Sequence, residues 1–337
     1  MGSIEDGNTV SDYHYDEIQS QHSISSSLIN FEWDEKKLNI IDAPGYLDFQ
    51  GEVKASMRVA DFAAVVINAA NGIEVGTELV YEYATKDYDI PQLIILNMLD
   101  RDNIDFENVI ESAKQRYGYK VFPIQVPVNS GEHYSQVGDV LRKEIHTYSN
   151  DGSGNFTVAK PEGEWVAKLD ELHEQLIELI AESDDALLET FFDQGELTED
   201  QLRGGMHHAF ISKAIIPVFA VSGKQNVGVK RLLDILAKYA PCASDFIEVT
   251  GKKPGSGEEI SHGVSVNDPV SAFIFKTVSE AHVGELSFFR VYSGKISPNE
   301  NLKNTTRDEN EKLRQIFYLN GKNRKDSSEI IAGDIGA

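Results

Sequence analysis

The sequence predicts an α/β fold in which a doubly wound, mostly parallel sheet precedes a small antiparallel β-barrel. Two almost entirely apolar runs, at residues 63–68 and 93–96, are typical of strands buried on both faces of a parallel sheet. Helical spacing over residues 74–86 separates them. A third apolar run, residues 215–221, precedes another helical pattern over residues 229–236. Strands that alternate with helices in this way indicate a doubly wound sheet.

The remaining segments give the domain plan. Alternation at residues 31–33 and 37–41 predicts two short strands near the start of a sheet domain that we place at residues 1–250. The alternation of strands and helices is interrupted at about 120–212, where we predict a helical or mixed insertion. This block contains a possible strand at 121–126 and a helical stripe over 164–192. Residues 251–265 are rich in glycine and charge and predict a linker. The alternation that follows predicts an incomplete barrel over residues 266–337.

Composition narrows the class of protein. The 337 residues carry 31 Lys and Arg against 55 Asp and Glu, a net charge of −24 that argues against binding DNA. Contact with RNA would require a local basic surface or further domains. The single cysteine, Cys242, permits no internal disulfide and fits a reducing cytoplasm. No apolar run approaches the length of a membrane span.

The strongest chemical signal follows the second short strand. Asp42 begins the motif Asp-Ala-Pro-Gly, which ends at Gly45. An aspartate at this place in a nucleotide-hydrolysing sheet holds the Mg²⁺ shell, and a glycine N–H faces the terminal phosphate where a side chain would clash. Taken alone, the motif is equally compatible with an ordinary turn, because Pro-Gly is a common turn pair.

Two further polar turns follow buried strands. Asn97 and Asp100 bound the first, where a carboxylate can accept two hydrogen bonds from guanine while the asparagine ties neighbouring loops together. Ser222, Gly223 and Lys224 form the second, whose backbone N–H groups can meet the guanine carbonyl. Each turn alone fits a polar strand terminus. All three turns sit at carboxyl ends of predicted strands, so we expect them to converge on one ligand.

Together these residues resemble the nucleotide-binding motifs of translational GTPases, most closely elongation factor G, over nearly the whole chain. The resemblance implies a P-loop-GTPase-like fold that binds GTP or GDP and Mg²⁺. It assigns Asp42, Gly45, Asn97, Asp100 and the Ser-Gly-Lys turn to the nucleotide. The segment at residues 12–25 is similar to the family's switch I, which implies that Ser23 binds Mg²⁺ together with Asp42.

The sequence departs from the family pattern in three places. No Gly-x-x-x-x-Gly-Lys-Ser/Thr occurs, so we expect a sheet truncated at its N-terminal end, without the phosphate-binding loop and first strand. Tyr46 occupies the position of the family's catalytic histidine, and a phenol with a pKa near 10 is a poor base at neutral pH. Met98 replaces a lysine that covers the nucleotide.

The favoured function is that of a cytoplasmic translational GTPase that promotes ribosomal translocation, with nucleotide binding and hydrolysis impaired in this chain. The alternative from another class is a non-catalytic, ribosome-associated regulatory module that keeps the fold without the turnover. A ribosomal-protection or release-type GTPase would share the same domains and also stays open.

Overall fold

The structure is a computed structural model that describes residues 2–195, 197–246, 248–253, 255–280 and 284–337. Contacts divide the chain into two compact units. Unit 1 comprises residues 1–61 and 242–337, and unit 2 comprises residues 62–241. The N-terminal segment therefore packs with the C-terminal barrel, while the continuous middle of the chain forms the parallel sheet and the insertion.

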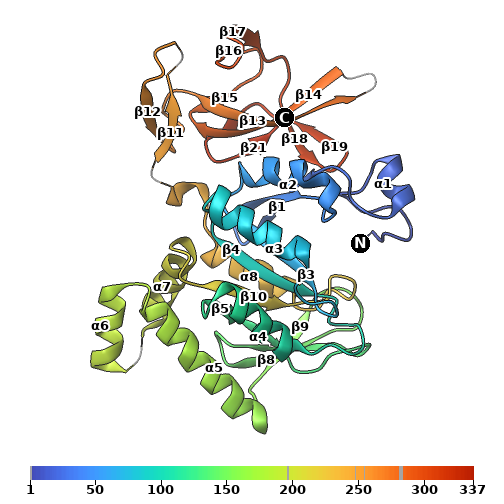
Figure 1. The fold of residues 1–337 in the computed structure, drawn as a ribbon, viewed down its shortest axis with the longest axis vertical. Coiled ribbons are helices and arrows are strands. Elements are labelled where there is room, and N and C mark those ends of the chain that lie inside the picture. The colour runs from blue at the N-terminus through green and yellow to red at the C-terminus, as the bar shows by residue number, and fades with distance from the viewer. Residues whose placement is uncertain (1, 196, 247, 254, 281–283) are drawn as a thin grey trace. The chain divides into compact units, whose positions relative to one another are not determined.

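Unit 2 is built on a four-stranded parallel sheet in the order β3-β4-β10-β5 (Figure 1). Its strands are β3 (Ala63–Asn68), β4 (Gln92–Asn97), β5 (Val121–Pro123) and β10 (Ile216–Ala220). The sequence predicted the three longer strands. The predicted insertion, residues 120–212, starts too early, because β5 pairs with β10 inside the sheet and the interruption begins after it. The possible strand predicted at 121–126 contains β5.

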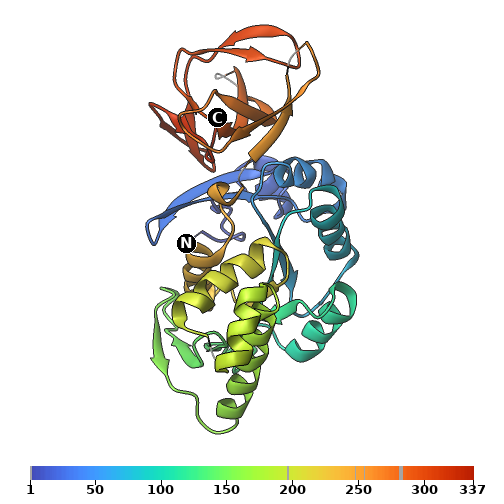
Figure 2. The same ribbon diagram turned by 90° about the vertical axis from the view of Figure 1, so that its left-hand side faces the viewer.

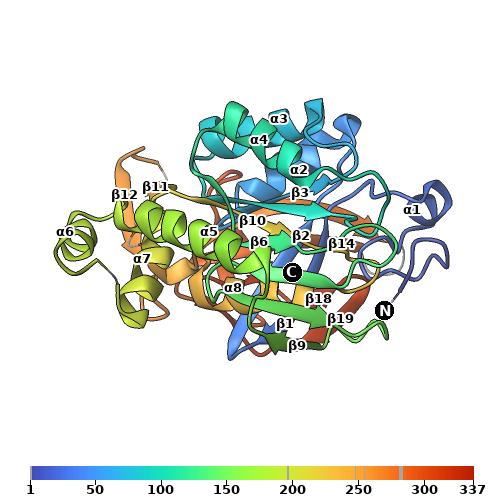
Figure 3. The same cartoon turned by 90° about the horizontal axis from the view of Figure 1, so that it is seen from below.

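Helices cover both faces of this sheet. The helices after β3 and β4 lie on one face and the helix after β10 on the other (Figure 3). They are α3 (Val75–Glu82), continued by the π-turn η2 (Tyr83–Asp87), α4 (Phe106–Tyr117) and α8 (Val229–Tyr239). Asp105 starts α4 by accepting a hydrogen bond from the Asn108 N–H at 3.0 Å.

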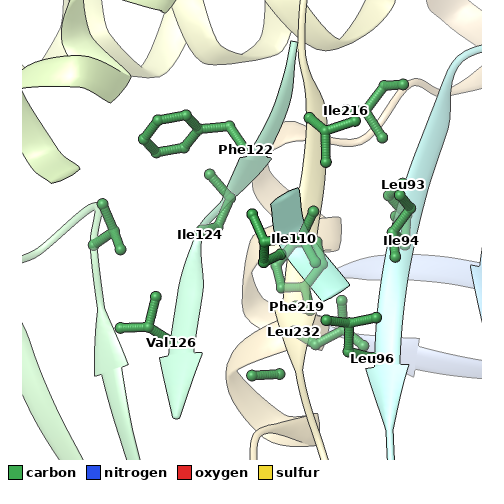
Figure 4. Packing of buried hydrophobic residues seen from close by; sticks show 14 of the residues in the cluster. Leu93, Ile94, Leu96, Ile110, Phe122, Ile124, Val126, Ile216, Phe219 and Leu232 are labelled. Atoms are coloured by element: carbon green, nitrogen blue, oxygen red, sulfur yellow. The ribbon is translucent and has the colours of Figure 1, made fainter. Parts of the chain in front are cut away.

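The core of unit 2 lies between the sheet and these helices. Leu93 and Leu96 of β4 are buried with Phe219 of β10 and Leu232 of α8 (Figure 4). Full burial of such a side chain contributes about 1.5–3 kcal/mol. The terminal strand β3 differs, because Val66 keeps 60% of its surface exposed.

The insertion combines an antiparallel sheet with three helices. Its strands are β6 (Gln125–Pro127), β7 (Gln136–Asp139), β8 (Glu144–Tyr148) and β9 (Phe156–Ala159), hydrogen-bonded in that order. Its helices are α5 (Glu164–Ala181), α6 (Asp185–Gln194) and α7 (Glu199–Ile211). The stripe predicted over 164–192 is thus two helices, because the Asp184 side chain accepts hydrogen bonds from the Ala186 and Leu187 N–H groups and begins α6. A Cβ at Gly205 of α7 would collide with Ile180 and Leu187, so the three helices pack closely.

Unit 1 begins with short elements. They are α1 (Tyr15–Ser20), β1 (Ser27–Trp33), β2 (Lys36–Asp42), the 3-10 turn η1 (Leu47–Phe49) and α2 (Gln50–Met57). The predicted strands at 31–33 and 37–41 are confirmed as parts of the antiparallel pair β1–β2. Leu28 and Ile41 of this pair pack into the barrel core beside Leu286 and Phe288.

The barrel of unit 1 consists of antiparallel strands, drawn in orange to red in Figure 2. They are β13 (Ser271–Glu280), β14 (Gly284–Ser293), β15 (Lys295–Ile296), β16 (Asn301–Asn304), β17 (Glu309–Lys312), β18 (Phe317–Asn320), β19 (Asn323–Asp326), β20 (Ile330–Ile331) and β21 (Ile335–Gly336). Ahead of them lie the turn η3 (Ala243–Asp245) and a hairpin, β11 (Glu248–Lys252) and β12 (Glu259–Gly263). Much of the segment predicted as a linker therefore forms this hairpin. Within the described residues, no helix is both long enough and apolar enough to cross a membrane.

Candidate functional site

Asn97 joins two of the predicted turns in unit 2. It ends β4, and its Oδ1 accepts hydrogen bonds from the backbone N–H groups of Met98 at 2.8 Å and Gly223 at 2.9 Å. Met98 has a φ of 67°, which turns the chain sharply after the strand. The amide therefore links the turn after β4 to the turn after β10, as we predicted for this asparagine.

The turn after β10 is closed by its own hydrogen bonds. Ser222 and Val227 exchange two backbone hydrogen bonds of 3.0 Å. The Ser222 hydroxyl is buried and accepts a hydrogen bond from the Gln225 N–H at 3.1 Å. The serine side chain thus shapes the turn from inside. Within the described residues the N–H groups of Lys224 and Asn226 have no acceptor, so the turn can offer backbone donors to a ligand.

Asp100 carries an unsatisfied oxygen beside this pair of turns. The adjacent Leu99 N–H donates to the Val221 carbonyl at 3.3 Å, which holds the two turns against each other. The Asp100 Oδ1 atom is buried and accepts no hydrogen bond from the described residues. A buried acceptor without a donor is costly, and a ligand that brings N–H groups would satisfy it.

The predicted magnesium residues lie in unit 1. Asp42 ends β2, and its pKa is raised because burial disfavours the charge. A hydrogen bond from Ser11 opposes this shift, whereas the nearby carboxylates of Asp12 and Glu17 add to it. The Ser23 hydroxyl donates to Asp12 Oδ1 at 2.7 Å. Asp42 therefore lies among like charges that a cation would neutralise.

Two other predicted positions are open. A Cβ built at Gly45 would contact no described residue within 4 Å, so packing within the described part of the chain does not require glycine there. Tyr46 is 56% exposed, with its ring centroid 4.4 Å from that of His22. Both residues belong to unit 1, whereas the turns after β4 and β10 belong to unit 2. Convergence of all three turns on one ligand stays a prediction.

Sequence reasoning missed two residues that shape these regions. Glu17 is buried, and its Oε1 accepts hydrogen bonds from the Ile24 and Ser25 N–H groups, which folds the serine-rich segment around it. Tyr134 in the insertion is 1% exposed, and its hydroxyl donates to the Ala220 carbonyl at 2.9 Å. Tyr134 stood in no recognisable motif. Glu17 lies within residues 12–25, the segment similar to switch I, but that resemblance gave no indication of its role as a hydrogen-bond acceptor.

Comparisons with known proteins find two family models that match this chain. The family model of the elongation factor Tu GTP binding domain matches residues 1–242, which is more than half of the chain, and that of elongation factor G domain 2 matches residues 269–337. A crystal structure of a protein from Thermus thermophilus matches with a TM-score of 0.85 and 24% identity, covering 99% of this chain and 47% of that one. The chain thus spans about half the length of that protein, whose likeness shows the fold. The chain belongs to the family of the elongation factor Tu GTP-binding domain, and its C-terminal part matches domain 2 of elongation factor G.

Proposed function

We propose that this chain supplies the guanine-reading part of an elongation factor G-like protein that acts on the ribosome in the cytoplasm and promotes translocation. The observation that carries the proposal is the joined pair of turns, Asn97 bonded to Gly223, next to the unsatisfied oxygen of Asp100. A carboxylate there can accept from the ring N–H and exocyclic amine of guanine. The Lys224 N–H can donate to the guanine carbonyl, whereas adenine presents a mismatched edge.

We assign the binding of Mg²⁺ to residues of unit 1. Mg²⁺ prefers oxygen ligands and retains several waters and phosphate oxygens, so few protein ligands suffice. The Asp42 carboxylate and the Ser23 hydroxyl fit this requirement, because the hydroxyl that donates to Asp12 keeps lone pairs for a cation. The described residues contain no group of three or more His, Cys, Asp or Glu side chains suited to a metal. When bound, the ion would supply positive charge to the phosphates.

We further propose that this chain binds nucleotide weakly and hydrolyses it slowly. The sequence has no phosphate-binding loop, and Tyr46 offers a phenol where the family has a histidine. The same two features favour a second candidate, a non-catalytic regulatory module that docks on the ribosome. Titration with GDP distinguishes them, because the module needs no working base site.

The test is a titration of fluorescent GDP and ADP into the wild-type chain and an Asp100→Asn variant. Micromolar binding of GDP with clear preference over ADP is expected. Hydrogen bonds to a charged group are worth about 1.5–3 kcal/mol, so the variant should lose roughly tenfold to a hundredfold in GDP affinity. It should gain affinity for xanthosine diphosphate, whose ring presents a carbonyl to the new amide donor.

Asp102→Asn is the matched control, because it makes the same chemical change at an exposed position two residues away. It should bind GDP like the wild type. Equal binding of GDP and ADP, or equal effects of the two substitutions, would contradict guanine reading by Asp100. No GDP binding at all would favour the regulatory module.

A further inference from the structure

A loop of the insertion, residues 129–135, contacts both the turn after β4 and the turn after β10. The Gly131 N–H donates to the Leu99 carbonyl at 2.9 Å, next to Asp100. The Gln225 side chain donates to the Glu132 carbonyl at 3.1 Å. One loop therefore reaches the turn after β4 and the turn after β10.

Tyr134 is the buried anchor of this loop. Its hydroxyl donates at 2.9 Å to the carbonyl of Ala220, the last residue of β10 and two residues before Ser222. Burial raises the pKa of Tyr134, and the neighbouring Tyr148 and Asp100 raise it further. The hydroxyl therefore keeps its proton and remains a donor at neutral pH.

The loop is itself held in one shape. Asn129 accepts hydrogen bonds from the N–H groups of Ser135 at 3.2 Å and Gln136 at 2.9 Å, and its amide donates to the His133 carbonyl. The Tyr134 N–H donates to the Gly131 carbonyl at 2.8 Å. Because these hydrogen bonds make the loop rigid, the position of its anchor Tyr134 determines the position of the whole loop.

We propose that Tyr134 is a positioning residue for guanine recognition. By fixing the end of β10 to the loop that also bonds Leu99, it sets the spacing between Asp100 and the turn at residues 222–227. The claim that this spacing serves guanine recognition rests on the proposed function. The mechanical link itself concerns only contacts within unit 2.

Amide hydrogen exchange resolved by residue tests the link in Tyr134→Phe, which removes the hydroxyl and keeps the ring. A lost buried hydrogen bond should speed exchange of the Ser222, Gln225 and Val227 amides by about fivefold. Other amides of the parallel sheet should exchange as in the wild type. Unchanged exchange in the turn, or acceleration spread uniformly over unit 2, would overturn the proposal.

Tyr117→Phe is the matched control. The Tyr117 hydroxyl is also buried but has no hydrogen-bond partner within the described residues. Its removal should leave the turn unchanged, and an equal effect in both variants would refute a specific role for Tyr134.

Titration with fluorescent GDP and ADP forms the second arm. Tyr134→Phe should weaken GDP binding by about fivefold and so reduce the preference over ADP. A purely stabilising role would instead lower the melting temperature without changing that preference. If the wild type bound no GDP, the proposed function would fail, whereas the exchange experiment would still decide whether Tyr134 positions the turn.

Discussion

The joined turns after β4 and β10 in unit 2 and the acidic segment of unit 1 are assembled from different interactions. In unit 2, the hydrogen bond from the Gly223 N–H to the Asn97 side chain joins two neutral groups. Contacts from the insertion support this pair of turns. In unit 1, Asp42 lies near Asp12 and Glu17, and its pKa is raised. We infer that the joined turns of unit 2 are preorganised by the chain alone, whereas the acidic segment of unit 1 depends on pH and on a cation.

The prediction with the largest expected effect concerns the buried ion pair that anchors the insertion of unit 2 to α8. Arg231 of α8 pairs with Asp139 of β7, and their side chains are only 2% and 0% exposed. Arg231→Met leaves a buried carboxylate unpaired and should lower the free energy of unfolding of unit 2 by about 3–5 kcal/mol. Urea unfolding followed by Trp165 fluorescence, with Trp33 replaced by Phe, measures this in unit 2.

The control for that experiment is Arg203→Met. Arg203 pairs with Asp200 at the surface, where the two side chains are 65% and 92% exposed. It should change the free energy of unfolding by less than about 0.5 kcal/mol. Similar losses in the two variants would mean that the buried pair does not anchor the insertion.

The second prediction concerns the role of Tyr46 of unit 1 in GTP hydrolysis. If Tyr46 limits hydrolysis because a phenol is a poor base at neutral pH, Tyr46→His should raise ribosome-stimulated GTP turnover by about a hundredfold. Tyr15→His changes another exposed tyrosine of unit 1 and should leave turnover unchanged. Unchanged turnover in Tyr46→His would mean that Tyr46 does not limit hydrolysis.

The smallest effect is a pH dependence that should have opposite signs at two carboxylates of unit 1. The raised pKa of Asp42 means that its ionised form destabilises the fold, so Asp42→Asn should raise the melting temperature at pH 7 without Mg²⁺. The gain should shrink as pH falls through the folded-state pKa, because wild-type Asp42 then binds its proton. Trp33 fluorescence, with Trp165 replaced by Phe, follows unit 1.

Glu52 gives the opposite case. Burial alone would raise its pKa, but hydrogen bonds from Lys276 and Ser26 outweigh burial and lower it. Its ionised form stabilises unit 1 above its unfolded-state pKa, and that contribution is lost as pH falls through the lower folded-state pKa. Glu52→Gln should therefore lower the melting temperature at pH 7. Shifts of the same sign in both variants would contradict the electrostatic account.

The sequence predicted the elements whose pattern is local. The apolar runs of β3, β4 and β10 and the helix α8 were visible because a buried strand or a helical stripe repeats over several residues. The division of 164–192 into α5 and α6 was not visible, since it depends on the side chain of Asp184 turning back to cap a helix. The hairpin β11–β12 was hidden by a composition typical of linkers.

The candidate site follows the same rule. Asn97, Asp100 and Ser222 were predicted as site residues because they lie at the end of a recognisable strand or just after one. The contact between Ser23 and Asp12 joins residues eleven apart in a polar segment without a period, and the bond from Tyr134 to Ala220 spans 86 residues. Contacts of this kind depend on tertiary packing, which a single sequence does not reveal.

The terminal strand β3 has a consequence for handling the protein. Its outer edge is unpaired in the sheet formed by the described residues, and the aliphatic side chain of Val66 is exposed beside it. Such an edge can template the addition of strands from other copies, and mutual repulsion at a net charge of −24 opposes that encounter. Near the isoelectric point of about 4.7, or in concentrated salt, this colloidal barrier disappears and solutions of the chain should turn cloudy.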